Sequence, residues 1–179
     1  MRAQRRFNMR SEPTEFVARD VMSIPAVACR ENAHFEEVAA LLADREISGM
    51  PVVDADARVV GVISERDLAH ALGGPLIRLA IRRPVGSGPF LRNPRGAAEG
   101  VHRAKDIMTE PPVTVDPGTP LHTLAEIMVK DQVNRLPVVR DERLVGVVTR
   151  GDVLAALAGL RERRPVALDE APIVVGDGI

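Results

Sequence analysis

The sequence predicts a mixed α/β (α+β) fold in which two β-α-β-β-α copies pack together with pseudo-two-fold symmetry. The first observation is an internal repeat: ARDVMSIPAV at Ala18 returns as AKDIMTEPPV at Ala104, and GVISERDLAHAL at Gly61 returns as GVVTRGDVLAAL at Gly146. The second is that each copy combines β-branched runs with runs of helical periodicity. The third is size, because copies of about 55 residues bury too little surface to be stable alone and are expected to share a core.

Each copy begins with a short apolar run that predicts a strand, Ala26 to Cys29 in the first copy and Val113 to Val115 in the second. An amphipathic helix is expected next, over FEEVAALLADRE in the first copy and LHTLAEIMVKDQ in the second. In the second helix, apolar residues recur at the spacing of one helix face: Leu121, Leu124, Ala125 and Met128.

A hairpin and a closing helix complete each copy. Two β-branched runs separated by a charged turn predict the hairpin, Pro51 to Val53 with Val59 to Ile63, and Pro137 to Val139 with Leu144 to Val148. The closing helix is expected over Glu65 to Leu72 in the first copy and over Arg150 to Leu160 in the second.

The repeat divides the chain into five expected parts: a basic N-terminal arm (1–15), the first copy (16–72), a basic Gly/Pro-rich linker (73–103), the second copy (104–160) and a C-terminal tail (161–179). The run APIVVGDGI in the tail is apolar enough to add an edge strand, and a flexible tail is the alternative.

Composition narrows the possible functions. The 179 residues include 24 Lys plus Arg and 25 Asp plus Glu, a formal net charge of -1, with four Phe and no Tyr or Trp. A site that stacks a base on an indole or phenol ring is therefore excluded. No run approaches the roughly 18 apolar residues of a membrane span, so no membrane partner is expected.

The single cysteine and the absence of familiar catalytic motifs predict a cytoplasmic protein that is not an enzyme. Cys29 is the single cysteine, and it aligns with Val115, so we expect a small buried hydrophobic residue rather than a nucleophile. The chain contains no G-x-G-x-x-G, Walker A or H-E-x-x-H motif and no Cys pair. We therefore predict no catalytic residue, no metal site and no required cofactor.

Three motifs occur in order in both copies. They are Asp-Val-Met-Ser and Asp-Ile-Met-Thr (Asp20 to Ser23, Asp106 to Thr109), the Met-Pro-Val-Val and Leu-Pro-Val-Val strands, and the Gly-h-h-Ser/Thr-x-x-Asp endings (Gly61 to Asp67, Gly146 to Asp152). With these motifs the chain resembles the cystathionine-β-synthase (CBS) domain family, whose members occur as tandem pairs called Bateman modules. The resemblance implies a regulatory sensor, commonly dimeric, that binds AMP, ADP, ATP or S-adenosylmethionine between its copies and acts on an effector protein.

The resemblance assigns ribose binding to the hydroxyl and carboxylate of the last motif, Ser64 and Asp67 in the first copy and Thr149 and Asp152 in the second. A carboxylate can accept hydrogen bonds from both vicinal hydroxyls of a ribose. The same pattern also predicts a helix N-cap with an acid in the first turn. The two roles are compatible.

Phosphate binding would need nearby cations, and the candidates are Arg66, Arg135 and Arg150, although each could also be a solvated surface arginine. Because the first copy has Ser48-Gly49 where the second has Asn134-Arg135, the first site is expected to lack one phosphate contact, which favours ligand in the second site. The expected adenine contacts are Met50, Leu136, Val27, Val113, Thr109 and Ser23. Met50 and Leu136 are the preferred cleft residues, and the valines are the more natural core residues.

The sequence therefore predicts a non-enzymatic ligand-sensing module that binds an adenosine nucleotide between its copies and forms a homodimer. The alternative is a protein-interaction or nucleic-acid-binding module with empty clefts, which would act through its basic linker and arm.

Overall fold

The structure, a computed structural model, describes residues 16–71, 103–160 and 171–176. The predicted N-terminal arm, the linker except Arg103, and residues 161–170 and 177–179 of the predicted tail lie outside this range.

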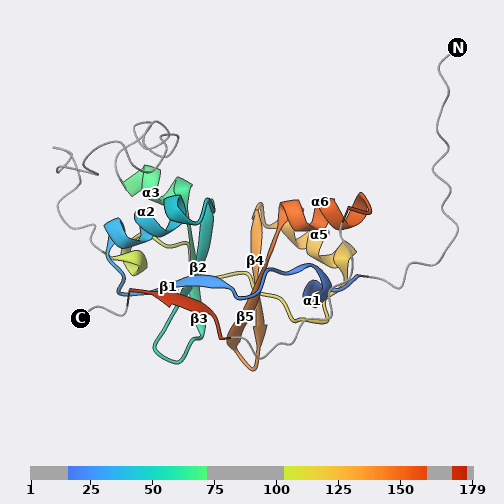
Figure 1. Cartoon of the computed structure of the whole chain (residues 1–179), viewed down its shortest axis with the longest axis horizontal. Coiled ribbons are helices and arrows are strands. Elements are labelled where there is room, and N and C mark those ends of the chain that lie inside the picture. The colour runs from blue at the N-terminus through green and yellow to red at the C-terminus, as the bar shows by residue number, and fades with distance from the viewer. Residues whose placement is uncertain (1–15, 72–102, 161–170, 177–179) are drawn as a thin grey trace, which may run out of the picture.

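The first copy contains the predicted β-α-β-β-α order after a short helix, and the second copy contains it without the first strand (Figure 1). The first copy contains α1 (Ala18–Val21), β1 (Val27–Arg30), α2 (Phe35–Asp44), β2 (Gly49–Val53), β3 (Val59–Ser64) and α3 (Glu65–Ala71). The second contains a 3₁₀ turn, η1 (Ala104–Asp106), followed by α5 (Leu121–Lys130), β4 (Arg135–Arg140), β5 (Arg143–Thr149) and α6 (Arg150–Leu157). The chain then adds β6 (Ile173–Val175).

The two hairpins lie side by side in the middle of the molecule, with α2 and α3 beside one and α5 and α6 beside the other (Figure 1). The first hairpin belongs to a four-stranded sheet of order β3-β2-β1-β6, in which β1 is parallel to both β2 and β6. The second hairpin, β4-β5, forms a two-stranded sheet. The predicted mixed fold is confirmed, and the C-terminal run forms an edge strand.

The first strand of the second copy is shorter than predicted. Within the described residues, the expected strand from Val113 to Val115 reduces to one parallel bridge between Val115 and Val138. Val115 donates to the carbonyl of Pro137 at 3.0 Å and accepts from Val139 at 2.9 Å. Two differences explain the short pairing. Prolines before and after this run lack an N–H to donate, and Val115 pairs on one side only, whereas β1 has a partner strand on each side.

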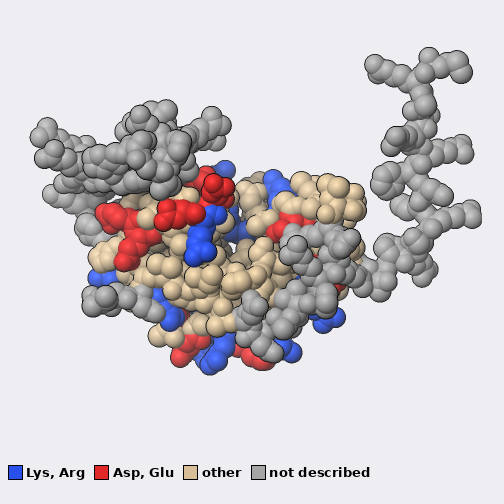
Figure 2. Space-filling model, viewed as in Figure 1, with Lys and Arg blue, Asp and Glu red and all other residues tan. Residues whose placement is uncertain are grey.

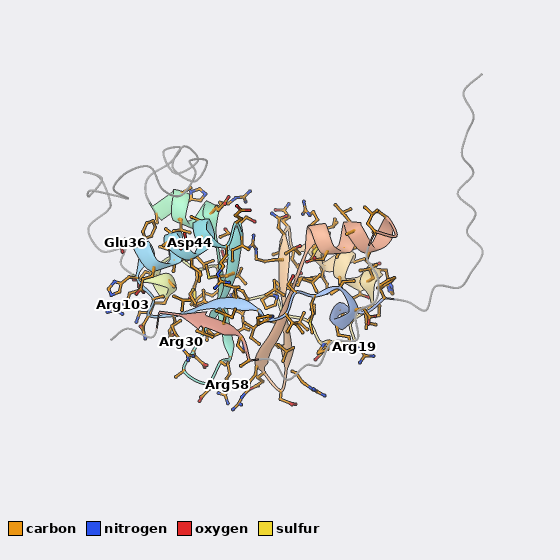
Figure 3. All side chains as sticks on the ribbon, viewed as in Figure 1. Arg19, Arg30, Glu36, Asp44, Arg58 and Arg103 are labelled. Atoms are coloured by element: carbon orange, nitrogen blue, oxygen red, sulfur yellow. The ribbon has the colours of Figure 1, made fainter. Side chains whose placement is uncertain are left out.

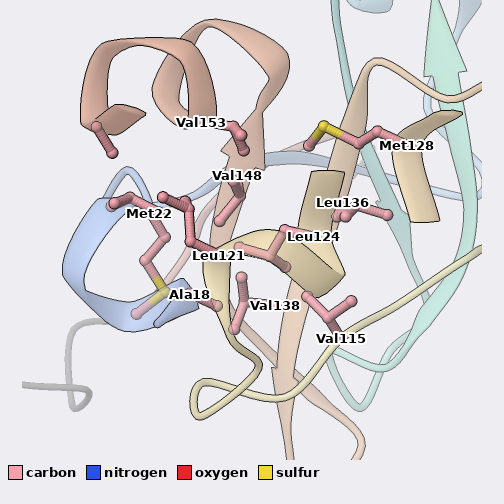
Figure 4. Close-up of a cluster of buried hydrophobic side chains, with 12 residues drawn as sticks. Ala18, Met22, Val115, Leu121, Leu124, Met128, Leu136, Val138, Val148 and Val153 are labelled. Carbon is pink, nitrogen blue, oxygen red and sulfur yellow. The ribbon is translucent and has the colours of Figure 1, made fainter. Parts of the chain in front are cut away.

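The stretch that precedes the first strand of each copy, which we call its leading segment (16–23 and 103–109), packs in the core of the other copy. Ala18, Val21 and Met22 are buried with Leu124 and Leu136 of the second copy (Figure 4). In the reverse direction, Ala104 is buried in the first-copy core, and Ile107 and Met108 pack against it. The two copies therefore exchange parts of their hydrophobic cores.

Two glycines permit this exchange. A Cβ placed on Gly146 would lie 2.3 Å from Sδ of Met22, and a Cβ on Gly61 would lie 2.4 Å from Sδ of Met108. Each methionine thus occupies the space that a side chain on the opposite β-hairpin would fill.

Backbone hydrogen bonds hold the ends of both leading segments on the opposite hairpins. Ser23 donates to and accepts from Val147, with N···O distances of 2.9 and 3.3 Å. Thr109 makes the equivalent pair with Val62, at 2.9 and 3.1 Å. The exchange therefore carries one hydroxyl residue from each copy to the hairpin of the other.

We expect Val21→Ala to destabilise the protein, because Val21 is fully buried in the second-copy core although it belongs to the first copy. Losing two buried methyl groups and leaving a cavity should cost about 1 to 3 kcal/mol. Urea unfolding followed by circular dichroism measures this, since the chain has no Trp or Tyr for fluorescence.

The control is Arg19→Ala on the same helix, α1, where the side chain is exposed and the change should stay within about 0.5 kcal/mol. An equal loss in the two variants would contradict the packing of α1 in the second-copy core.

Candidate functional site

A hydroxyl–carboxylate set lies where β3 meets α3. The backbone N–H and Oγ of Ser64 both donate to Oδ2 of Asp67, at 2.7 and 2.6 Å. Thr109 Oγ1, brought here by the leading segment of the second copy, lies 3.5 Å from Oδ1 of the same carboxylate. We call Ser64, Asp67 and Thr109 the first set. All three are at least partly exposed to solvent.

The equivalent group where β5 meets α6 contains Thr149 and Asp152. The N–H and Oγ1 of Thr149 both donate to Oδ2 of Asp152 at 2.7 Å, and the N–H of Asp152 donates to Oγ1 of Thr149 at 3.3 Å. The predicted N-cap role of Thr149 is confirmed. Ser23 is exposed on the leading segment that bridges to Val147. We call Thr149, Asp152 and Ser23 the second set.

Each set presents a partly exposed carboxylate, and a residue of the other copy is held near it through the backbone pair of Thr109 with Val62 or of Ser23 with Val147. In the first set the cap hydrogen bonds use Oδ2 of Asp67, while Oδ1 faces the hydroxyl of Thr109. A carboxylate held in this way can accept hydrogen bonds from vicinal hydroxyls of a ligand. The sequence missed that the last member of each set comes from the other copy, and no local pattern signals it.

Arg135 begins β4 in the second copy, but its guanidinium lies in the first. Its Nη2 donates to Oγ of Ser48 at 2.7 Å, and its Nη1 and Cζ lie directly over Gly49. Burial lowers the pKa of the guanidinium, while Glu65 and Asp67 oppose this shift by attraction. The prediction that Arg135 belongs to the second site is therefore wrong. Its side chain lies beside the first set, because Gly49 leaves space for it there.

The other two predicted phosphate contacts, Arg66 and Arg150, are exposed near the starts of α3 and α6. They lie on the same elements as the first and second sets, respectively. Their side chains are therefore open to solvent next to the two carboxylates.

The predicted adenine contacts divide into buried and accessible residues. Met50 and Leu136, the preferred cleft candidates, are only 1% and 0% exposed and belong to the two cores. They are opposite Ile63 and Val148 in the hairpin registers, on the buried face. This preference is corrected, because strand register turns both side chains inward. Val27 and Val113 are partly exposed.

A pocket of about 720 Å³ lies away from both sets, where the end of β1 meets the start of α2. Arg30 and Arg103, labelled together at that end of the first copy in Figure 3, are among its lining residues. Arg30 donates to the carbonyl of Asp54, and Arg103 donates to that of Asn32 at 2.9 Å. Acidic and basic lining residues balance, and no predicted site residue lines the pocket.

Within ranges 16–71, 103–160 and 171–176, His, Cys, Asp and Glu side chains form no group of three that could hold a metal ion. No helix of this described part is long and apolar enough to cross a bilayer. Cys29 is 1% exposed, as predicted for a small buried hydrophobic residue, and burial raises the pKa of its thiol from 9.0 to about 12.

Comparison with known proteins identifies the repeat. The family model for the CBS domain matches residues 18–74 and 104–159, the two copies. The chain belongs to the CBS domain family. It is 33% identical to the Methanocaldococcus jannaschii protein MJ1426 over 153 residues, which cover 78% of this chain and 89% of that protein.

Two solved CBS domain pairs have similar folds. One is the pair of protein MJ0100 in complex with 5′-methylthioadenosine and S-adenosyl-L-methionine: TM-score 0.63, 26% identity, covering 81% of this chain and 98% of that chain. The other is CBSX2 in complex with AMP, a protein of Arabidopsis thaliana: TM-score 0.62, 25% identity, covering 81% and 98%.

We expect Cys29 to resist thiol reagents in the folded protein at pH 8 and to react once urea unfolds the chain. Because its folded pKa is raised, the thiol contributes stability that is fully present below about pH 9 and is lost as the pH rises toward 12. Colour release from a disulfide reagent measures the reactivity. Rapid reaction of the folded protein would show that the site is open.

Proposed function

We propose that this chain is a non-catalytic regulatory module that binds an adenosine nucleotide where its two CBS copies meet. The observation that carries the proposal is the duplicated hydroxyl–carboxylate set, in which Asp67 and Asp152 each lie partly exposed in a fixed orientation. Support comes from similar CBS pairs that were solved in complex with AMP or with 5′-methylthioadenosine and S-adenosyl-L-methionine.

In this proposal, Asp67 and Asp152 accept hydrogen bonds from the ribose hydroxyls, and Ser64 and Thr149 orient the carboxylates. The adenine rests on aliphatic groups near the partly exposed Val27 and Val113, because no Tyr or Trp is present. Thr109 and Ser23 add hydroxyl groups from the opposite copy.

Ligand occupancy can change the arrangement of the copies because each set draws residues from both. A ligand at the first set would touch α3 of the first copy and Thr109 of the second copy's leading segment. Binding would then stabilise the arrangement in which both contacts are made. An effector protein that distinguishes the arrangements would respond to the ligand.

We also propose that the chain forms a homodimer through α5 and α6. Four apolar side chains at or near these helices are exposed, and they are Val129, Leu154, Leu157 and Leu160, from 59% to 82%. Figure 2 shows few charged side chains over α5 and α6, whereas acidic side chains gather over the helices of the first copy. An uncharged apolar patch on one face is typical of a contact surface.

The cytoplasmic location stays a prediction. The alternative nucleic-acid function depends on the arm and linker, which fall outside the described residues except Arg103.

We expect a nucleotide that co-purifies with the protein to dominate its absorbance near 260 nm, because without Trp or Tyr the chain absorbs little at 280 nm. For the nucleotide-free protein, calorimetry should detect binding of AMP. The double variant Asp67→Ala/Asp152→Ala should weaken that binding by about tenfold or more, since it removes charge-assisted hydrogen bonds.

The matched control is Asp20→Ala/Asp106→Ala. These carboxylates accept backbone hydrogen bonds at comparable positions, from Val17 at 3.0 Å and from Arg103 at 3.2 Å, but lie in the leading segments. If both folded double variants bound AMP as tightly as the original chain, the ribose assignment would be wrong.

We expect Leu154→Glu to convert a dimer into a monomer, because a buried unpaired charge opposes association. Light scattering during gel filtration measures the mass. Ala40→Glu, an exposed change on α2, is the control and should leave the dimer intact. A monomeric original chain would refute the dimer proposal.

A further inference from the structure

The two copies differ at one pair of equivalent positions that face the two sets. Gly49 begins β2 and pairs with Ser64 of the first set, and Arg135 begins β4 and pairs with Thr149 of the second set. A glycine therefore occupies the position in the first copy that an arginine occupies in the second.

Gly49 is the reason that Arg135 can enter the first copy. A Cβ at position 49 would lie 2.5 Å from Nη1 of Arg135, 2.6 Å from its Cζ and 2.5 Å from the carbonyl oxygen of Ile63. Both the guanidinium and the backbone fill that space, so any side chain there would displace Arg135.

The guanidinium is held beside the first set rather than folded against its own copy. Among the described residues, its one hydrogen-bond partner is Ser48. Because a guanidinium carries five N–H donors, others are left to bind a ligand. Glu65 and Asp67 lie near enough to attract it. The guanidinium is partly exposed, and its other N–H groups can donate to an anion bound alongside the first set.

The second set receives no equivalent cation. By the pseudo-symmetry, the residue that would reach from the first copy toward Thr149 and Asp152 is the one at position 49, and glycine has no side chain. Arg66 and Arg150 do not distinguish the sets, because each is exposed next to its own set.

We infer that the chain binds a phosphate-bearing adenosyl ligand at the first set only, with Arg135 of the second copy as its phosphate-binding residue. This reverses the expectation from the sequence, which placed the additional cation in the second site. It rests on the proposed function and adds to it the ligand charge, the location and the number of phosphate-bearing ligands per chain. Arg135 would also connect the copies, since it begins in one and contacts ligand in the other.

The experiment is calorimetry of the full chain with AMP and with adenosine, which lacks the phosphate. We expect one AMP per chain. Arg135→Met retains an unbranched side chain over Gly49 but removes the charge, and should weaken AMP binding at least tenfold while adenosine binding changes less than twofold. Arg135→Lys should restore part of the AMP affinity, because it restores the charge.

Matched variants of the second copy and of the carboxylates locate the site. Arg150→Met should leave AMP affinity within twofold of the original chain. Asp67→Ala should weaken AMP binding about tenfold or more, and it should do so more strongly than Asp152→Ala. Circular dichroism of each variant checks that the fold is retained.

The outcomes separate the inference from the proposed function. Absence of binding for AMP and adenosine alike overturns both. AMP binding that is unaffected by Arg135→Met, or that is lost in Asp152→Ala but not in Asp67→Ala, overturns the inference and leaves the proposed function standing. Two equal AMP sites per chain also overturn it.

Discussion

The structure depends on the exchange of leading segments between the two copies. Val21 and Met22 complete the hydrophobic core of the second copy, and Ala104 and Met108 do the same for the first. Small copies bury too little apolar surface alone, so each obtains part of its core from its neighbour. The methionines can pack this closely because Gly146 and Gly61 have no side chain. The pair is therefore a single folding unit as well as a repeat.

The same exchange makes the candidate sites composite. Met108 packs against the first copy, and the next residue, Thr109, forms a backbone hydrogen-bond pair with Val62. This pair holds the Thr109 hydroxyl near the carboxylate of Asp67 in the other copy. Arg135 crosses the boundary in the same direction, from the second copy to the first, and donates a hydrogen bond to Ser48. A ligand at the first set would therefore contact both copies at once, so its binding would favour the arrangement of the copies in which both contacts are made.

Local patterns predicted what depends on local interactions. The helices, the hairpins and the Thr149 cap follow from apolar spacing, from turn residues and from a hydroxyl three residues before an acid. The preference for Met50 and Leu136 as cleft residues was wrong, because the face that a strand residue occupies depends on sheet register. The strand at Val113 to Val115 was overestimated, because an apolar run does not reveal whether partners flank it.

By itself, the sequence determined that the chain is a tandem repeat of α/β units, that no indole or phenol ring can hold a base, and that Ser64, Asp67, Thr149 and Asp152 stand at helix starts. Only the tertiary structure decided in which of the two sites each side chain lies. The Thr109 hydroxyl lies near the carboxylate of Asp67 in the first copy, and the guanidinium of Arg135 lies over Gly49 although its backbone pairs with Thr149. The physical reason is that these contacts join residues 42 and 87 positions apart, and packing across the pseudo-two-fold boundary, rather than local propensity, brings them together.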